Sequence, residues 1–415
     1  MRGLAAALGF LGALASGLAA ADDRIGWFET EAFPGTLKAR ASDHEGAPAA
    51  APLGFDEIES LRTQLPVTIP TAPPDGGPHA LDALVYAPRQ TPAGLRRPVI
   101  VITHGNPRDT RQQRATRLHR YGHLAEEFAR RGYVAAVVAR RGFARSSGHY
   151  VGWYGRCDSV EADGYERAGR TGAQDLRAAL SALAEDPRID PARMMALGTS
   201  GGGFAALALA AEMTELRGAI AFAPGRGSVR DGENCNADAL AEAFARFGRP
   251  GAAPSLWLYS TEDRFFGPEM VHRQFAAFGG PARLVMTGAI LHAKDGHRLF
   301  QRGNTALWRG EIDAFLRAIG MPTWEAPPAD PTDLDMPPPD GLSPRGLAAW
   351  REYLGSEASR AFATGQNGRF GWASAYRSGR IAEREALETC QEGTQAAMAE
   401  TETPCEIRRT DTAHR

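Results

Sequence analysis

The sequence carries no dominant charge and no long apolar run beyond its first residues. Among 415 residues, 47 are Lys or Arg and 49 are Asp or Glu, which gives a formal net charge of -2. Nucleic-acid binding usually requires a basic surface, so we expect no nucleic-acid partner. The locally basic run 108–117 is typical of a solvated loop or helix face. Because no later stretch of about 18 apolar residues exists, we expect no stable membrane insertion after processing of the N-terminus.

Cysteine is scarce, and the sequence contains only Cys157, Cys235, Cys390 and Cys405. These residues form no CxxC pair and have no His at zinc-binding spacing, so we expect no metal site. An even number of cysteines in an exported chain favours disulfides, and four cysteines allow three pairings. We favour Cys157–Cys235, in loops near the expected active-site edge, and Cys390–Cys405, which closes a short loop.

The N-terminal residues have the pattern of a secretory signal peptide. Arg2 supplies a positive start, and Leu4 to Leu18 is an apolar run. Ala19 to Ala21 is a small-residue cleavage site, and the polar Asp22 follows it. An uncleaved membrane anchor is the alternative, but the apolar run is short for one. We therefore expect a secreted or periplasmic protein.

Proline and hydrophobic patterning divide the chain into segments. Residues 322–344 are rich in proline and acidic residues, which is typical of a semi-rigid linker. We predict a signal peptide, an N-terminal arm, a catalytic domain, a Pro-rich linker and a small Cys-containing module, at residues 1–21, 22–62, 63–321, 322–344 and 345–415. The last segment is small, and the Cys390–Cys405 pair would help to stabilise it.

Strand and helix patterns alternate through the predicted catalytic domain. We expect strands at 65–70, 80–88, 97–103, 133–139, 193–197, 218–223, 255–260 and 283–286, and helices at 121–131, 174–184, 203–213 and 305–319. We also expect a short helix at 55–61, and in the C-terminal module helices at 345–354 and 381–390 with a strand at 370–374. This alternation predicts an α/β fold with a mainly parallel central sheet and helices on both faces.

A candidate nucleophile lies between a predicted strand and a predicted helix. Gly198-Thr199-Ser200-Gly201-Gly202 matches the pattern G-x-S-x-G. A tight strand-to-helix turn exposes the serine, and the flanking glycines allow close backbone contacts. A helix N-terminus next to Ser200 also favours negative charge there. The context therefore favours a nucleophilic serine over an ordinary glycine-rich turn.

A serine nucleophile requires a base and an orienting acid. Asp263 follows the predicted strand 255–260, and Glu262 is the alternative acid. His297 lies between the last predicted strand and the last helix, and His292 is the alternative base. The order Ser200, Asp263, His297 is the order in which strand-to-helix serine hydrolases carry their triad. We therefore predict these three residues as catalytic.

Stabilisation of the oxyanion requires two backbone N–H groups near the nucleophile. Gly201 directly follows Ser200 and is the first expected donor. The second is expected in the loop His104-Gly105-Asn106-Pro107, which follows the strand 97–103, and we assign it to Asn106. A plain Gly-Asn-Pro turn is the alternative interpretation of this loop.

These motifs together resemble those of the α/β-hydrolase superfamily over residues 65–320. The resemblance includes His104-Gly105, Gly198-x-Ser200-x-Gly202, Asp263, His297, Arg140 to Ser146 and Leu256 to Gly267. Within the superfamily, the chain looks like exported bacterial proteins of the dienelactone-hydrolase-like branch. Dienelactone hydrolases use a cysteine nucleophile, and Ser200 at that position favours ordinary esters over lactones. The segment 368–405 resembles a small module attached to various exported bacterial proteins, which implies no role.

The sequence therefore predicts a serine hydrolase that acts on small-molecule carboxylic esters (EC 3.1.1 class) without a cofactor or metal. One alternative is a serine peptidase of the prolyl-oligopeptidase type, although the chain shows no propeller repeats. Another alternative is a non-catalytic binding protein on a hydrolase scaffold. Phe222, Phe244 and Phe247 are either substrate-pocket walls or core residues.

Overall fold

The computed structural model describes residues 25–26, 52–70, 76–150, 152–161, 163–290, 295–324, 336–356, 359–374, 378–392 and 404–411. The predicted signal peptide, most of the predicted N-terminal arm and His292 lie outside these described residues. Ser200, Asp263, His297 and all four cysteines lie within them.

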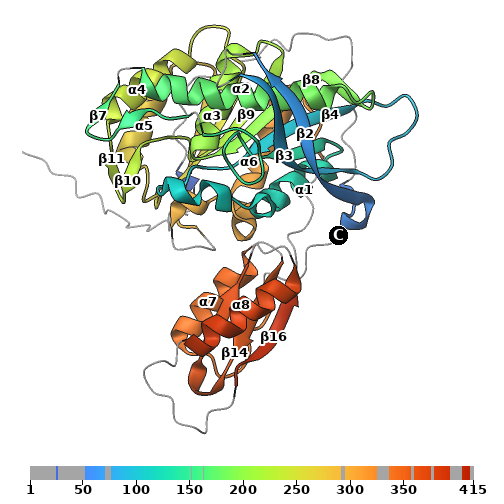
Figure 1. Ribbon diagram of the computed structural model, residues 1–415, viewed down its shortest axis with the longest axis vertical. Helices are drawn as coiled ribbons and strands as arrows, with labels where there is room; N and C mark the ends of the chain where they lie inside the picture. The colour runs from blue at the N-terminus through green and yellow to red at the C-terminus, as the bar shows by residue number, and fades with distance from the viewer. Residues whose placement is uncertain are drawn as a thin grey trace, which may run out of the picture.

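A nine-stranded sheet forms the centre of the larger part of the molecule (Figure 1). Neighbouring strands from β5 to β13 pair in parallel, whereas β2, β3 and β1 are added antiparallel at the two ends. In spatial order the strands are β1 (Ile25–Gly26), β13 (Ala282–Thr287), β12 (Ser255–Ser260), β9 (Leu216–Phe222), β8 (Ile189–Thr199), β4 (Arg97–Thr103), β5 (Val134–Val138), β3 (Gly77–Pro88) and β2 (Ile58–Ile69).

Helices cover both faces of this sheet, as Figure 1 shows. They are α1 (Gly122–Arg130), α2 (Gly164–Ala184), α3 (Gly201–Glu212), α4 (Ala237–Phe247), α5 (Pro268–Phe278) and α6 (Thr305–Ala318). Side chains of α2, α3, α4 and α5 share one buried cluster with one face of the sheet, and side chains of α1 and α6 share a second cluster with the other face. The predicted mainly parallel sheet with helices on both faces is therefore confirmed.

The central strand β4 shows why the sequence specifies two covered faces. Val99 and Val101 belong to the first buried cluster, whereas Ile100 and Ile102 belong to the second. A strand buried on both faces has to be apolar at every position, so its sequence is a continuous run instead of an alternating one. The helix α3 is buried along nearly its whole length, because it lies at the middle of the sheet.

Several predicted boundaries differ from the structure. The helix expected at 55–61 is only a 3-10 turn, Phe55–Glu57, and β2 begins directly after it at Ile58. The strand forms because its residues pair along their full length with β3. α2 is ten residues longer at its N-terminus than the predicted 174–184, and α4 and α5 were not predicted. Phe222, Phe244 and Phe247 are buried in the two clusters and serve as core residues.

The C-terminal module is a separate small sandwich that lies beyond the side of the sheet covered by α1 and α6 (Figure 1). Its three-stranded sheet has the order β15 (Phe370–Ala373), β14 (Arg360–Thr364), β16 (Glu406–Asp411). Alternate residues of β14 face opposite helices: Ala361 and Ala363 pack in the cluster with α8 (Gly379–Glu392), and Phe362 packs in the cluster with α7 (Pro344–Leu354).

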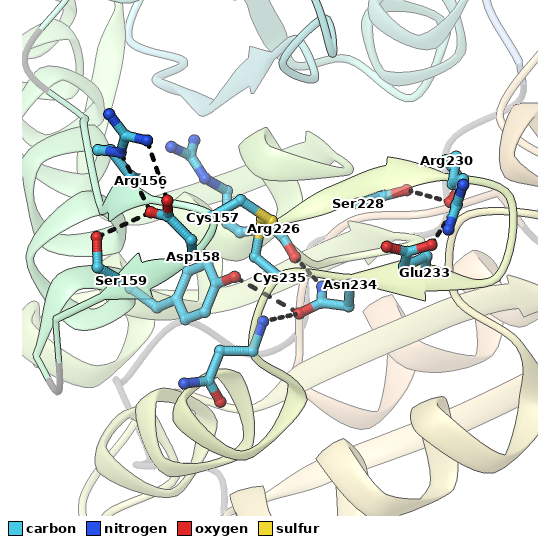
Figure 2. The surroundings of a disulfide bond; sticks show 12 residues. Arg156, Cys157, Asp158, Ser159, Arg226, Ser228, Arg230, Glu233, Asn234 and Cys235 are labelled. Atoms are coloured by element: carbon cyan, nitrogen blue, oxygen red, sulfur yellow. Dashed lines mark hydrogen bonds and ion pairs between the residues drawn. A yellow bond between two sulfur atoms is a disulfide. The ribbon is translucent and has the colours of Figure 1, made fainter.

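Two disulfides join the cysteines in the pairs that the sequence favoured. Cys390 and Cys405 are linked within the C-terminal module, with 6.2 Å between their Cα atoms. Cys157 and Cys235 are linked with a Cα separation of 4.8 Å. Figure 2 shows that this bond joins the hairpin β6–β7 (Gly155–Arg156 and Ser159–Val160) to the hairpin β10–β11 (Ser228–Arg230 and Glu233–Asn234).

Candidate active site

Ser200 occupies a sharp turn between β8 and α3. Its backbone has φ 53° and ψ -122°, a strained conformation for a residue other than glycine. The neighbouring glycines make the turn possible, because a Cβ atom at Gly198 would lie 2.1 Å from the carbonyl oxygen of Gly202. A Cβ atom at Gly202 would lie 2.4 Å from the carbonyl oxygen of His104. The G-x-S-x-G spacing thus has a steric cause at both outer glycines.

Backbone hydrogen bonds hold this strained turn in place. The Ser200 N–H donates to the Phe222 carbonyl at the end of β9, at 2.8 Å. The Ser200 carbonyl accepts from the N–H groups of Phe204, at 3.0 Å, and Gly225, at 3.3 Å. The end of one neighbouring strand and the first turn of α3 therefore fix the position of the serine.

Asp263 and His297 are brought together from two loops at the same edge of the sheet. His297 Nδ1 lies 2.9 Å from Asp263 Oδ2, and the Asp263 side chain is fully buried. Asp263 Oδ1 accepts from the N–H groups of Phe265, at 2.7 Å, and Phe266, at 3.0 Å. The alternative acid, Glu262, is turned away and accepts from the Ile290 N–H at 3.3 Å. Asp263 is therefore the carboxylate that can orient the imidazole.

Two aromatic rings hold the imidazole in its plane. The Phe265 ring is stacked on His297, with a centroid distance of 4.0 Å and an interplanar angle of 7°. The Phe266 ring meets His297 edge-on at 5.6 Å. The guanidinium of Arg108 covers the Phe265 ring, with its central carbon 3.8 Å from the ring centroid. This packing and the Asp263 contact restrict the ring to one orientation.

Asn106 and Gly201 lie next to each other beside the serine. A Cβ atom at Gly201 would be 2.1 Å from Asn106 Oδ1, and one at Gly105 would be 3.1 Å from Ser200 Cβ. The two predicted oxyanion residues are therefore adjacent, and the lack of a side chain at Gly105 lets this loop approach Ser200 without a tight Cβ contact. Asn106 Nδ2 donates to the Tyr150 hydroxyl at 3.2 Å.

Two buried arginines surround Asn106. Its Oδ1 accepts from Arg140 Nη2 and from Arg226 Nη1, both at 2.8 Å. Arg140 Nη1 also donates to the Gly201 carbonyl at 3.0 Å. Within the described part of the chain, neither arginine forms an ion pair with a carboxylate. The charge of Asp175 partly balances that of Arg140. The positive charge that remains beside Ser200 favours developing negative charge there.

Burial of this charge changes two pKa values. Desolvation, followed by the charge of Arg226, lowers the pKa of Arg140 to about 10. Burial, followed by the charge of Arg140, lowers the pKa of His104 well below its usual value. Since His104 Nε2 accepts from the Arg140 N–H at 3.2 Å, its proton is on Nδ1, which donates to the Gly105 carbonyl at 2.8 Å. His104 is therefore a neutral structural residue of the loop that carries Asn106.

Ser200 opens on two cavities. The smaller, of about 160 Å³, is lined by Tyr150, Trp153, Tyr154 and Arg226, among others. The larger, of about 790 Å³, also includes His297 and extends past Arg117, Arg120 and Arg298. The two cavities share Asn106, Pro107, Arg108, Ser200 and Phe265. A small group and a large group can therefore be accommodated on the two sides of one reacting carbonyl.

One part of the chain matches a known family. Residues 128–230, which include Ser200 and its glycines, match the prolyl oligopeptidase family. The matched residues include the strained turn at Ser200, which lies between β8 and α3 of the mainly parallel sheet. The chain has the α/β-hydrolase fold. The match and the fold together indicate a hydrolase of the esterase or peptidase type.

Solved structures similar to this α/β-hydrolase include both esterases and peptidases. A protein assigned as a dienelactone hydrolase from Klebsiella pneumoniae is 16% identical, covers 63% of this chain and 98% of its own, and has a TM-score of 0.40. An acylaminoacyl peptidase from Pyrococcus horikoshii is 16% identical, with coverages of 66% and 44% and a TM-score of 0.44. An acetyl xylan esterase from Paenibacillus sp. R4 is 14% identical, with coverages of 64% and 85% and a TM-score of 0.44. These structures say nothing about the substrate, and no curated protein matches the chain.

The site of the α/β-hydrolase also contains residues that the sequence did not predict. Phe265 and Phe266 follow Asp263 after one residue, Arg264, so their closeness to the acid along the chain could have suggested a role in the site. Arg226 and Tyr150 carried no signal, because they reach Asn106 from separate loops. Arg226 lies in the loop that follows β9, whereas Tyr150 lies in the segment between β5 and β6. Only the folded chain brings them to the same asparagine.

Proposed function

We propose that this α/β-hydrolase is an exported serine esterase that cleaves carboxylic esters through an acyl-enzyme on Ser200. The observation that carries the proposal is the contact of His297 with the buried Asp263, in a loop that lines the same cavity as the strained Ser200. An imidazole that a buried carboxylate orients, in the same cavity as a serine, is the arrangement that nucleophilic catalysis requires.

The mechanism has two steps. Ser200 Oγ attacks the ester carbonyl and gives its proton to His297, while Asp263 stabilises the imidazolium and keeps its ring orientation. The N–H groups of Gly201 and Asn106 stabilise the oxyanion, and the positive charge of Arg140 and Arg226 supports them. His297 returns the proton to the leaving alcohol. It then activates a water molecule, which releases the acid and restores Ser200.

A fluorophosphonate probe tests the nucleophile directly. Ser200→Ala should lose all labelling and lower kcat for nitrophenyl acetate by a factor of about 10⁴ to 10⁶. The matched control is Ser228→Ala, because Ser228 lines the smaller cavity but is not a proposed catalytic group. If Ser200→Ala keeps a tenth of the wild-type activity, the nucleophile is another residue. Labelling of wild-type protein also excludes a non-catalytic binding protein on this scaffold.

The histidine assignment requires a second pair of variants. His297→Ala should abolish fluorophosphonate labelling, because the base that accepts the Ser200 proton is lost. His292→Ala should retain labelling, since His297 already has the Asp263 contact. The reverse result would assign the base to His292.

A serine peptidase is the second candidate, and the family match over residues 128–230 favours it specifically. Both activities use the same nucleophile and base, so labelling does not separate them. Nitrophenyl esters and aminoacyl anilides should be compared at matched acyl groups. We expect the esters to be cleaved at least about a hundredfold faster than anilides of the same acids. A smaller difference between the two rates would replace the esterase assignment by a peptidase assignment.

Export is supported by the N-terminal pattern and by the two disulfides, which form in oxidising compartments. In addition, none of the helices in the described ranges has the length and apolar character to cross a bilayer. N-terminal sequencing of protein from the exported fraction should begin at Asp22. Free thiols in that material would contradict both the pairing and the export.

A further inference from the structure

The larger cavity beside Ser200 has one wall that the catalytic domain does not supply. Ser200 and His297 line it from the central sheet, and Glu352, Ser356, Trp372 and Ser374 line it from the C-terminal module. These four residues come from the end of α7 and from the edge strand β15. The module is therefore part of the space that a substrate would enter. It follows the 3-10 helix η5 (Arg302–Asn304) and helix α6 of the catalytic domain along the chain.

A backbone hydrogen bond joins the module to the catalytic domain. The Gly303 N–H in η5 donates to the Gly355 carbonyl at the end of α7, at 3.2 Å. On the catalytic side, the chain leaving α6 is fixed at Thr323 and Trp324. Thr323 Oγ1 donates to Asp313 Oδ1 at 2.7 Å, and Trp324 Nε1 donates to Asp313 Oδ2 at 3.0 Å. These two hydrogen bonds to Asp313 therefore fix the position at which the chain leaves the catalytic domain.

The cavity-lining corner of the module is rigidly built. Arg360 is fully buried, and its Nη1 donates to the carbonyls of Tyr353, at 3.0 Å, and Ser356, at 2.8 Å. Its Nε donates to Asp411 Oδ2 at 2.9 Å. A cation at the end of a helix satisfies carbonyls that have no partner within the helix. The segment that carries Glu352 and Ser356 is thereby fixed relative to the sheet of the module.

Trp372 gives this wall its chemical character. It pairs with Phe362 across the strands β15 and β14, and its side chain is half-buried against the α7 cluster. The rest of the charged lining carries both signs: it comprises Arg117, Arg120, Arg298 and Asp295 from the catalytic domain and Glu352 from the module. The indole therefore distinguishes this wall, and it suits a long group that has apolar or aromatic surface to pack on it.

We propose that the C-terminal module forms one wall of the substrate cavity and selects esters whose portion remote from the carbonyl is long enough to reach Trp372 and packs on its indole. This inference rests on the proposed esterase function. Short esters need only the catalytic domain, because Ser200, His297 and the smaller cavity all belong to it. Long esters also contact the module.

A photocrosslinking experiment on the wild-type chain tests the position of the wall. The probe is a fluorophosphonate with a long chain that ends in a diazirine. The Ser200 oxygen forms a bond to phosphorus, fluoride leaves, and the serine proton goes to His297. After irradiation, we expect crosslinks on peptides that contain residues 352–356 or 372–374. Labelled Ser200 with crosslinks confined to residues 97–320 would overturn the inference, whereas no labelling of Ser200 would overturn the esterase proposal instead.

Kinetics on full-length variants test the selectivity. Trp372→Ala should lower kcat/KM for nitrophenyl esters of long, phenyl-ended acids about fivefold to tenfold, through KM, and leave nitrophenyl acetate unchanged. The matched control is Leu347→Ala, because Leu347 is exposed on helix α7 of the same module and does not line the cavity. Trp372→Phe should recover most of the loss, which separates a lost contact from a misfolded module. Equal effects of Trp372→Ala on long and short esters would refute the proposal.

Discussion

Replacing Asp263 by Asn changes one atom of a side chain whose two oxygens have different partners. Oδ1 accepts from two backbone N–H groups, and Oδ2 faces His297 Nδ1. If the Asn carbonyl takes the position of Oδ1, its NH₂ group faces Nδ1 and forces the imidazole proton onto Nε2. The base then cannot accept the Ser200 proton. In the other orientation, the NH₂ group would face the N–H groups of Phe265 and Phe266, a contact between donors in a buried site.

The backbone N–H groups therefore favour the first orientation, which removes the neutral imidazole that can accept a proton at Nε2. The wrong tautomer in a comparable triad lowers kcat by about 10⁴, which corresponds to about 5 kcal/mol of transition-state stabilisation. We expect this loss in kcat for nitrophenyl acetate, with little change in KM. Circular dichroism and thermal unfolding would show whether the fold is retained.

Two neighbouring carboxylates supply matched controls. Asp295 Oδ1 accepts from the His297 N–H at 2.9 Å and from the Arg264 N–H at 3.1 Å, and Asn accepts equally well at such a position. Asp295→Asn and Glu262→Gln should therefore stay within about threefold of wild-type kcat, a change below 1 kcal/mol. An Asp263→Asn variant with a tenth of wild-type kcat, or a larger loss in Glu262→Gln, would refute the assignment of the acid.

Three further outcomes follow from buried groups and the first disulfide. Replacing Cys157 and Cys235 by Ser removes a link between residues 78 apart, which should lower the free energy of unfolding by about 4 kcal/mol and reduce kcat/KM; unchanged urea denaturation would contradict this. Asp313→Ala leaves the buried Arg131 with a weaker set of partners and should cost about 3–5 kcal/mol, so an unchanged urea midpoint would count against it. Burial lowers the pKa of His104, so the unfolded chain binds more protons than the folded one below about pH 6.5, and stability falls as the pH is lowered there. Consequently, wild type should lose more unfolding free energy than His104→Gln between pH 7 and pH 5, and parallel losses would contradict this.

The sequence was most informative where one local pattern has one structural solution. The run at β4 is apolar at every position because both faces of the strand are covered, and this pattern can be recognised in any chain. The glycines around Ser200 were equally readable, since their Cβ atoms would collide with nearby carbonyl oxygens. The order of Ser200, Asp263 and His297 along the chain then suggested one site from three separate loops.

Patterns that depend on distant partners were less informative. β2 was expected to begin later, at 65, because its first residues lack strong alternation, and only pairing with β3 makes them a strand. Helix α2 begins well before its predicted start, where residues 164–173 are rich in glycine and charge. Burial of the Tyr165 side chain in the core shows that tertiary packing supports this first half.

By itself, the sequence determined the layered fold, the candidate nucleophile with its acid and base, and the preferred cysteine pairs, because each depends on local sterics or on order along the chain. Tertiary structure alone decided which groups surround these residues. The Arg140–Asn106–Arg226 cluster and the wall formed by Trp372 join loops far apart in the sequence. No local pattern encodes such contacts, because the distance between two loops is set by the packing of the elements that carry them.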